Sequence, residues 1–258
     1  MVRRFIILIA FFLVLGTVGL YSVVTRIERV RTAREQANLA ASKALRPDIQ
    51  IIVVEGKRRE EIALILEQAH ICSADEFLKA SIGKEGELFP DTYRFFPYTP
   101  AAQVVSTLYS NYETRTAKAN AVPTATQLSI ASIVEREAIG DADRAAIAGV
   151  YLNRVRVGMR LEADPTVQYG RDTNQIAALG LSTNFTFWKD ITQDDYHGVP
   201  SPYNTYLNDG LPPTPIANPG LASIQAAIHP TISNYFYFLY RNGKLLLSKT
   251  IEEHQSKQ

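Results

Sequence analysis

The stretch Thr126–Ala138, TQLSIASIVEREA, determines how we interpret the rest of the chain. On a helix, Ile130, Ile133 and Val134 share one face, because residues three and four apart are neighbours there. Glu137 follows these three residues at spacings of seven, four and three, so its carboxyl falls within an apolar stripe, where an ionised group is costly to bury. Such an environment raises the pKa of a carboxyl, as a general acid requires. The alternative is a structural role, in which the carboxyl pairs with an arginine or caps another element.

The residues after Glu137 predict a second helix paired with the first. Gly140 is a helix stop signal, and Asp141 can cap a following helix that ends at Gly158. Two helices joined by a short turn form an αα-hairpin. Glu137 then lies near the open end of the hairpin, where a substrate could reach it. Glu135, two residues earlier, points to a different face of the helix.

The composition excludes several classes of function. The net charge is +1 with 21% charged residues, unlike the basic surface that nucleic-acid binding needs. The single cysteine, Cys72, excludes an intramolecular disulfide, and neither it nor the four histidines have the spacing of metal ligands. We therefore expect no nucleic-acid partner and no dedicated metal site. No cofactor is expected either, because a mechanism that uses a single catalytic carboxyl requires none.

The N-terminus predicts a membrane anchor. Phe5–Val24 carries no charged residue, and a helix of this length matches a hydrocarbon core of roughly 30 Å. It has no A-x-A cleavage site of a signal peptide, so we expect an uncleaved single span within residues 1–25. Arginines on both sides leave the orientation open by the charge rule. Residues 26–50, polar and rich in alanine, predict a helical stalk or linker.

Residues 51–85 predict a small α+β module. A strand at Ile51–Val54 is followed by two short helical patterns, and the module is too small to be stable alone. The segment Gly86–Tyr98, GELFPDTYRFFPY, predicts an irregular loop whose rings pack in a core rather than a sugar platform. The helices expected around this loop are Arg59–Ala69, Ala74–Ser81 and Ala101–Arg115.

Past Gly158 we expect long polar loops lining a groove, with Gly220–Ile228 as the one helix and a hairpin at Asn242-Gly243. Asp164, Asn204 and Thr205 are candidate polar groups of that groove, and turn formation is the alternative role for each. The same motif-like pieces add four further candidate substrate-binding residues: Thr166, Gln168, Tyr206 and His229.

The motifs, taken together, resemble the MltG (YceG-like) family of endolytic murein transglycosylases. They occur in the order LFPDTYRF, ASIVERE, YLNRVRVGMRLEADPTVQYG, SPYNTY, GLPP, IANPG and AAIHP, over roughly Gly86–His254. The resemblance implies an α+β fold: one N-terminal span, a LysM-like module (residues 51–85, shorter than in the family) and a transglycosylase domain (residues 86–258). It also implies that Glu137 is catalytic. The departures are the shortened module and Thr214, where a glycine is common in the family.

The resemblance further implies what the protein acts on and where. The expected substrate is the nascent glycan strand of peptidoglycan, cut without hydrolysis outside the cell inner or plasma membrane, with peptidoglycan synthases as partners. One carboxyl suffices if the C6 hydroxyl of the substrate is the nucleophile, and the product is then a 1,6-anhydro-MurNAc end. Two alternatives remain open: a membrane-tethered glycan-binding scaffold without catalysis, and a two-carboxylate glycosidase that uses Glu137 with Asp164.

Overall fold

The computed structural model describes residues 25–26, 28–32 and 47–258. It divides into two compact units, Met1–Asp48 and Ile49–Gln258. In the first unit the described residues 25–26 and 28–32 are helical. The predicted span Phe5–Val24 lies outside the described residues. Within the part of the chain that is described, no helix has both the length and the apolar character needed to cross a membrane.

The second unit begins with a small α+β arrangement, as the sequence predicts. β1 (Ile49–Ile52) pairs antiparallel with β2 (Thr92–Phe95), and between them lie α2 (Arg59–Gln68) and α3 (Ala74–Ala80). The expectation of an irregular loop over residues 86–98 is wrong at β2. Alternation explains the difference: Tyr93 and Phe95 are buried while their neighbours are exposed, which is the pattern of a half-buried strand.

Helix α4 (Ala101–Lys118) closes this part of the core. Its apolar face joins residues of β1, α2, α3 and β2 in one hydrophobic cluster, whose fully buried members include Ile62, Leu66, Phe77, Leu88, Val104 and Leu108. The cluster therefore combines residues from both sides of the predicted boundary between 85 and 86. That domain boundary stays a prediction.

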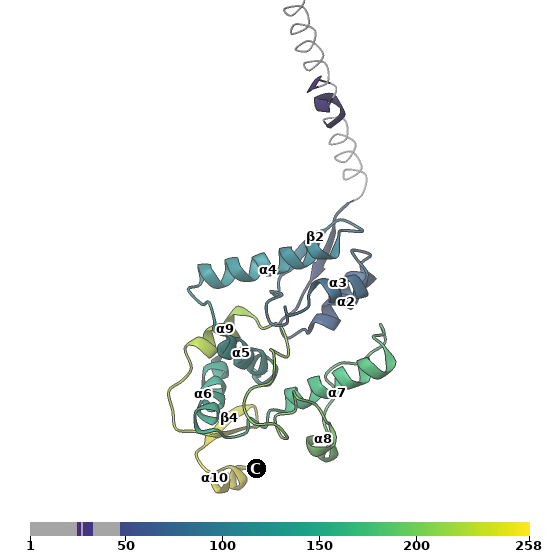
Figure 1. The fold of residues 1–258 in the computed structure, drawn as a ribbon. Coiled ribbons are helices and arrows are strands. Elements are labelled where there is room, and N and C mark those ends of the chain that lie inside the picture. Colours follow the sequence, from purple (N-terminus) through teal and green to yellow (C-terminus); the bar gives the residue numbers. More distant parts are fainter. Residues whose placement is uncertain (1–24, 27, 33–46) are drawn as a thin grey trace, which may run out of the picture. The chain divides into compact units, whose positions relative to one another are not determined.

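The second hydrophobic cluster is built on three helices that pack on one another, α5 (Ala125–Glu137), α6 (Asp141–Val157) and α9 (Leu221–Ile228). Figure 1 shows α5, α6 and α9 grouped together. Thr124 caps α5, accepting a hydrogen bond from the backbone of Gln127, whose side chain bonds back to Thr124. Gly158 ends α6 at φ +69°, a left-handed conformation that glycine adopts without strain.

The expectation of mainly loops after Gly158 is wrong. α7 (Asp164–Leu179) is sixteen residues long, and α8 (Gln193–Gly198) and α10 (Ile251–Lys257) are also helical. Pro165, which favours a loop interpretation, stands in the first turn of α7, where proline is compatible with a helix. Loops nevertheless make up most of residues 180–220, between α7 and α9.

The predicted hairpin near the C-terminus is confirmed. β3 (Tyr237–Arg241) pairs antiparallel with β4 (Lys244–Ser248) across a two-residue turn. Asn242 and Gly243 both have positive φ, 53° and 72°, as a type I′ turn requires. α10 packs on this hairpin.

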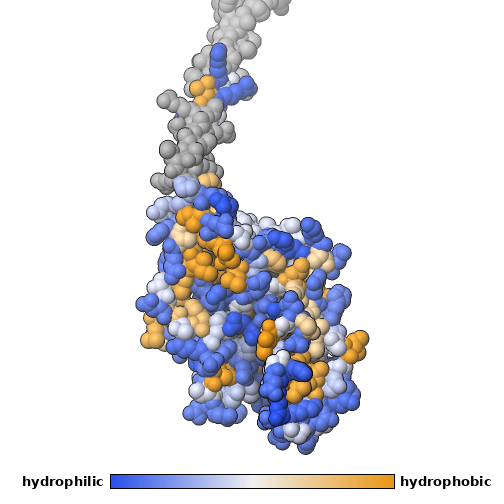
Figure 2. All heavy atoms as spheres, turned by 180° about the vertical axis from the view of Figure 1, so that it is seen from behind, coloured by the Kyte–Doolittle hydropathy of each residue, from blue (hydrophilic) through white to orange (hydrophobic). Residues whose placement is uncertain are grey.

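The unit is thus a mixed α+β fold in which helices predominate. On the face in Figure 2, hydrophilic residues cover much of the surface, and hydrophobic residues form separate small groups. Exposed apolar side chains in the described part include Ile52, Ile82, Val122 and Ile139.

Candidate active site

Glu137 is the last residue of α5, so it lies at the turn into α6 and not near the open end of the hairpin as expected. It lines a pocket of about 400 Å³, here called the active-site pocket. Elements far apart in the sequence form its walls: the end of α5, the inner face of α6, the start of α7, the loop before α9, β3 and α10. Its polar and aromatic lining consists of Glu137, Tyr151, Arg154, Glu162, Asp164, Tyr196, Tyr206, Tyr237, Phe238, His254 and Gln258.

Tyr151 holds the carboxyl of Glu137. The tyrosine lies on α6 and is 1% exposed, and its Oη donates a hydrogen bond to Oε1 of Glu137 at 2.8 Å. The Tyr151 ring in turn meets Phe238 of β3 edge-on, with 5.7 Å between the ring centroids. Because packing fixes the donor, the orientation of the Glu137 carboxyl is set before any substrate arrives.

The pKa of Glu137 is raised from 4.5 to about 7. Desolvation by burial is the main cause, and the negative charge of Asp164 acts in the same direction. The Tyr151 hydrogen bond and the positive charge of Arg154 oppose the rise. A carboxyl with a pKa near neutrality can both give up a proton and take one back at working pH, which suits general acid–base catalysis.

Asp164 and Tyr206 form a second polar pair in the same pocket. Tyr206 Oη donates to Asp164 Oδ1 at 2.7 Å. Burial and the Asp164 carboxylate both raise the pKa of Tyr206, so its hydroxyl stays protonated. Tyr196 packs beside Tyr206, with ring centroids 4.5 Å apart. Aromatic surface and hydrogen-bonding groups therefore occur together in this pocket.

Arg154 joins three segments around the pocket. Its Nε donates to the Phe236 carbonyl at 2.6 Å and its Nη1 to the Leu161 carbonyl at 2.7 Å. The guanidinium carbon lies 5.1 Å from the centre of the Tyr237 ring. Arg154 thus fixes the strand and the loop that flank Glu137, while its charge remains close enough to influence the Glu137 pKa.

Three of the predicted polar residues are buried braces outside the pocket lining. Thr166 and Thr205 share a hydrogen bond at 2.8 Å between their hydroxyls, and Thr205 Oγ1 also accepts from the Ala163 backbone. Asn204 donates to the carbonyls of Tyr196 and Val199 and accepts from the Tyr206 backbone. These contacts fix the start of α7 against the loop that carries Tyr206.

Gln168 and His229 also lie outside the lining of the active-site pocket. Gln168 donates to the carbonyls of Trp188 and Lys189. His229 is exposed, at the C-terminal end of α9. Of the predicted site residues, the structure therefore brings together Glu137, Asp164 and Tyr206.

Glu135 is placed on a different face of α5, as its position in the helix predicts. Its Oε1 pairs with Arg144 at 3.1 Å, and its Oε2 accepts from the Gly220 backbone at 2.9 Å. This carboxylate therefore joins α5 to α6 and to the start of α9, away from the active-site pocket.

Sequence reasoning missed several lining residues, above all Tyr151, Arg154 and His254. Tyr151 and Arg154 lie three residues apart on α6, a spacing that places them on one face but gives no sign of what that face meets. His254 stacks on Tyr237, and its Nδ1 is buried without a hydrogen-bond partner among the described residues. The only local signal was that a polar aromatic residue stands on a buried helix face.

No group of three or more histidine, cysteine, aspartate or glutamate side chains could hold a metal ion within the described residues. The active-site lining itself offers one histidine and three carboxylates, and two of those carboxylates already accept hydrogen bonds from tyrosines. The expectation that the protein uses no metal or cofactor stays a prediction.

Two curated relatives are similar to this chain over 66% of its length. An endolytic murein transglycosylase of Bacillus subtilis (strain 168) is 40% identical over 178 residues, which is 46% of that protein. An endolytic murein transglycosylase of Streptococcus pneumoniae serotype 2 is 31% identical over 183 residues, 31% of that protein. The matched part thus spans less than half the length of these relatives.

A solved structure is also similar. The crystal structure of a YceG-like protein of Listeria monocytogenes superposes with a TM-score of 0.68 and 30% identity, covering 82% of this chain and 76% of that one. The model of the YceG-like family matches residues 19–258. This match extends over nearly the whole chain, and we conclude that the protein belongs to the YceG-like family.

Proposed function

We propose that this protein is an endolytic peptidoglycan transglycosylase that cuts the β-1,4 bond between MurNAc and GlcNAc in nascent glycan strands. The observation that carries the proposal is the Glu137 carboxyl, held by Tyr151 in a pocket that raises its pKa to about 7. The names of the two bacterial relatives support the same activity.

In the proposed mechanism Glu137 acts twice. Protonated, it gives its proton to the glycosidic oxygen as the bond from that oxygen to C1 of MurNAc breaks. As a carboxylate, it then takes the proton from the C6 hydroxyl while O6 bonds to C1 and closes the 1,6-anhydro ring. Glu137 ends protonated, and no water is consumed. Acid–base help of this kind is typically worth about 10²–10⁴-fold in rate.

Tyr151 determines which oxygen of Glu137 carries the proton. Because the Tyr151 hydroxyl donates to Oε1, that oxygen is an acceptor, and the acid proton belongs on Oε2. The same hydrogen bond stabilises the carboxylate formed after the first proton transfer. Tyr151 is thus a positioning residue in both halves of the reaction.

A two-carboxylate glycosidase is the second candidate, because Asp164 lines the same pocket and its charge raises the Glu137 pKa. In that mechanism Asp164 acts as nucleophile or activates water, and the product is a reducing sugar. One oxygen of Asp164 already accepts a hydrogen bond from Tyr206, so its other oxygen would have to attack the sugar or activate water in that mechanism.

The reaction in ¹⁸O-labelled water tests the proposal. The purified full chain acts on nascent glycan, and the new ends are weighed by mass spectrometry. We expect 1,6-anhydro ends without label, each lighter by one water than a hydrolysed end. Labelled reducing ends as the main product would refute the transglycosylase mechanism in favour of the glycosidase. Absence of any cleavage by correctly folded protein would favour the non-catalytic scaffold.

We further propose that residues 1–25 anchor the protein in the cell inner or plasma membrane, with the catalytic part outside. The uncharged run Phe5–Val24 and the extracytoplasmic location of the substrate support this. Cleavage of a strand during its synthesis must occur beside the enzymes that elongate it, so the peptidoglycan synthases are the proposed partners. A C-terminal reporter that is active only outside the cytoplasm tests the topology, and an inactive reporter on a stably expressed fusion would contradict it.

A further inference from the structure

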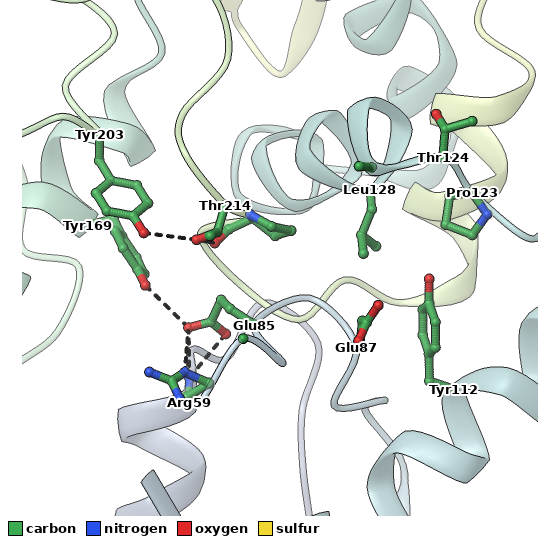
Figure 3. Close-up of a pocket in the computed structure, with 13 residues that line it drawn as sticks. Arg59, Glu85, Glu87, Tyr112, Pro123, Thr124, Leu128, Tyr169, Tyr203 and Thr214 are labelled. Carbon is green, nitrogen blue, oxygen red and sulfur yellow. Dashed lines mark hydrogen bonds and ion pairs between the residues drawn. The ribbon is translucent and has the colours of Figure 1, made fainter. Parts of the chain in front are cut away.

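A second pocket, of about 330 Å³, lies between the Gly83–Glu87 loop, the N-terminal end of α5 and the loop around Thr214. We call it the distal pocket, and it shares no lining residue with the active-site pocket. Figure 3 shows Tyr203 and Thr214 at one end, Tyr112 and Glu87 at the other, and Leu128 between them. Its volume lies at the lower end of the range of about 300–1,000 Å³ for small-ligand pockets, which suits a single ring.

The distal pocket shares three elements with the active-site pocket, namely α5, α7 and the loop between α8 and α9. α5 contributes Leu128 to the distal pocket and Glu137 to the other, and α7 contributes Tyr169 and Asp164 in the same way. The loop between α8 and α9 does likewise with Tyr203 and Tyr206. Leu128 and Glu137 are nine residues apart, roughly 13 Å along the helix axis and about 180° around it, so the two pockets lie on different sides of α5.

Tyr112 presents an unused polar group to the distal pocket. Its side chain is 8% exposed and lines the cavity, and its hydroxyl has no hydrogen-bond partner among the described residues. The Oη atom is not one of the buried side-chain atoms without a partner, so it is open to solvent within the cavity. In Figure 3 the Tyr112 ring stands at the edge of the cavity beside Glu87. A ligand hydroxyl or amide placed there could hydrogen-bond to Tyr112 in place of solvent.

The remaining lining indicates an uncharged ligand with both polar and apolar faces. Leu128, Pro123 and Pro215 form apolar wall, whereas Tyr203 and Thr214 present hydroxyls 2.9 Å apart. The charged groups are internally paired. Glu87 bonds Lys84 at 2.9 Å, and Glu85 accepts from the Arg59 backbone and from Asn218.

We propose that the distal pocket binds an uncharged N-acetylhexosamine unit, away from the bond that is cut. A pyranose ring has apolar faces for the prolines and Leu128, and edge hydroxyls for Tyr112, Tyr203 and Thr214. The identity of the ligand rests on the proposed function, whereas the pocket and its unpartnered hydroxyl do not. Binding there would hold glycan at a second point on the protein.

Fluorine NMR of the full chain in detergent micelles, labelled with 3-fluorotyrosine, tests the proposal. The chain has thirteen tyrosines. Tyr112, Tyr169 and Tyr203 report on the distal pocket, and Tyr151, Tyr196, Tyr206 and Tyr237 report on the active-site pocket. Tyrosine-to-phenylalanine variants assign the signals. The probe is chitotriose, and the background is Glu137→Gln, so that no cleavage occurs.

We expect chitotriose to shift the signals of the three distal tyrosines. Tyr112→Phe should raise the Kd reported by Tyr169 and Tyr203 about five-fold, the value of one net hydrogen bond, and leave the Kd at the active-site tyrosines unchanged. Thr214→Val is the second variant, with a similar expected loss. Tyr98→Phe, the same substitution at a residue 75% exposed and outside both pockets, is the matched control.

The proposal would be overturned if the fluorine signals of the distal tyrosines did not shift at chitotriose concentrations that saturate the active-site pocket. An unchanged Kd in Tyr112→Phe would also overturn it. Equal shifts at all tyrosines would indicate non-specific contact and would also overturn it. Chitohexaose then shows whether one strand or two strands occupy the pockets. If it binds more tightly than chitotriose and the gain depends on both pockets, one strand bridges them; if the two oligomers bind with equal affinity, the pockets hold separate strands. Because cleavage is absent from this assay, its result is independent of the ¹⁸O experiment.

Discussion

Replacing Glu137 by glutamine should make the protein more stable at alkaline pH while abolishing cleavage. In the folded protein the pKa of Glu137 is about 7, against an ordinary value of 4.5. Since the folded-state pKa is the higher one, ionising Glu137 costs folding free energy. The cost is absent below pH 4.5, grows between pH 4.5 and 7, and is complete above pH 7.

The size of the effect follows from this difference in pKa. About 2.5 pH units at about 1.36 kcal/mol each correspond to about 3 kcal/mol. Glutamine is uncharged and can still accept the Tyr151 hydrogen bond, so most of the cost should vanish at pH 8.5. For a chain of this size, a gain of that order raises Tm by roughly 5–10 °C.

Thermal unfolding of the full chain at pH 4.5 and pH 8.5 measures the effect. The expected result is an equal Tm for wild type and Glu137→Gln at pH 4.5 and a higher Tm for the variant at pH 8.5. Glu135→Gln is the matched control on the same helix. It loses the ion pair with Arg144, so it should lose stability at pH 8.5 and should retain more activity than Glu137→Gln. Equal destabilisation by Glu137→Gln at both pH values would refute the reasoning.

Three further predictions concern single side chains. Tyr151→Phe removes the hydrogen bond that favours the Glu137 carboxylate, so the Glu137 pKa should rise. The alkaline limb of the kcat/KM profile should therefore move up by about one pH unit. Initial rates between pH 5 and 9 measure this shift, and a downward shift would contradict the prediction. Gly170→Ala would place a methyl group 2.7 Å from Ser201 Oγ. Urea unfolding should then show that the free energy of unfolding falls by roughly 1–3 kcal/mol. Unchanged stability would contradict this close approach of α7 to the loop. Asn204→Ala removes two donated hydrogen bonds and one accepted hydrogen bond inside the core. The free energy of unfolding should fall by roughly 1–3 kcal/mol, and KM should rise because the loop that carries Tyr206 is less well fixed. An unaltered KM would argue against the positioning role of Asn204.

Local signals made much of the fold predictable. The helix stop at Gly158 and the turn at Asn242-Gly243 each depend on residues within one turn of chain, which is why they could be recognised without tertiary information. The errors also had local causes. Proline in the first turn of α7 resembles a loop signal, and β2 is hidden in a segment dense in aromatic residues.

The position of Glu137 within an apolar stripe was visible from helical spacing alone, and so was the separate face of Glu135. Which groups share the pocket with Glu137 was decided by tertiary structure, because Tyr151, Asp164 and His254 come from three other helices. Periodicity describes one element at a time and contains no distance between elements. For the same reason Thr166, Asn204 and Thr205 have the residue types expected in a groove, whereas in the folded protein they are buried and hydrogen-bond to one another or to the backbone. Only the packing of α7 against its loop determines which polar groups pair with each other and which face a substrate.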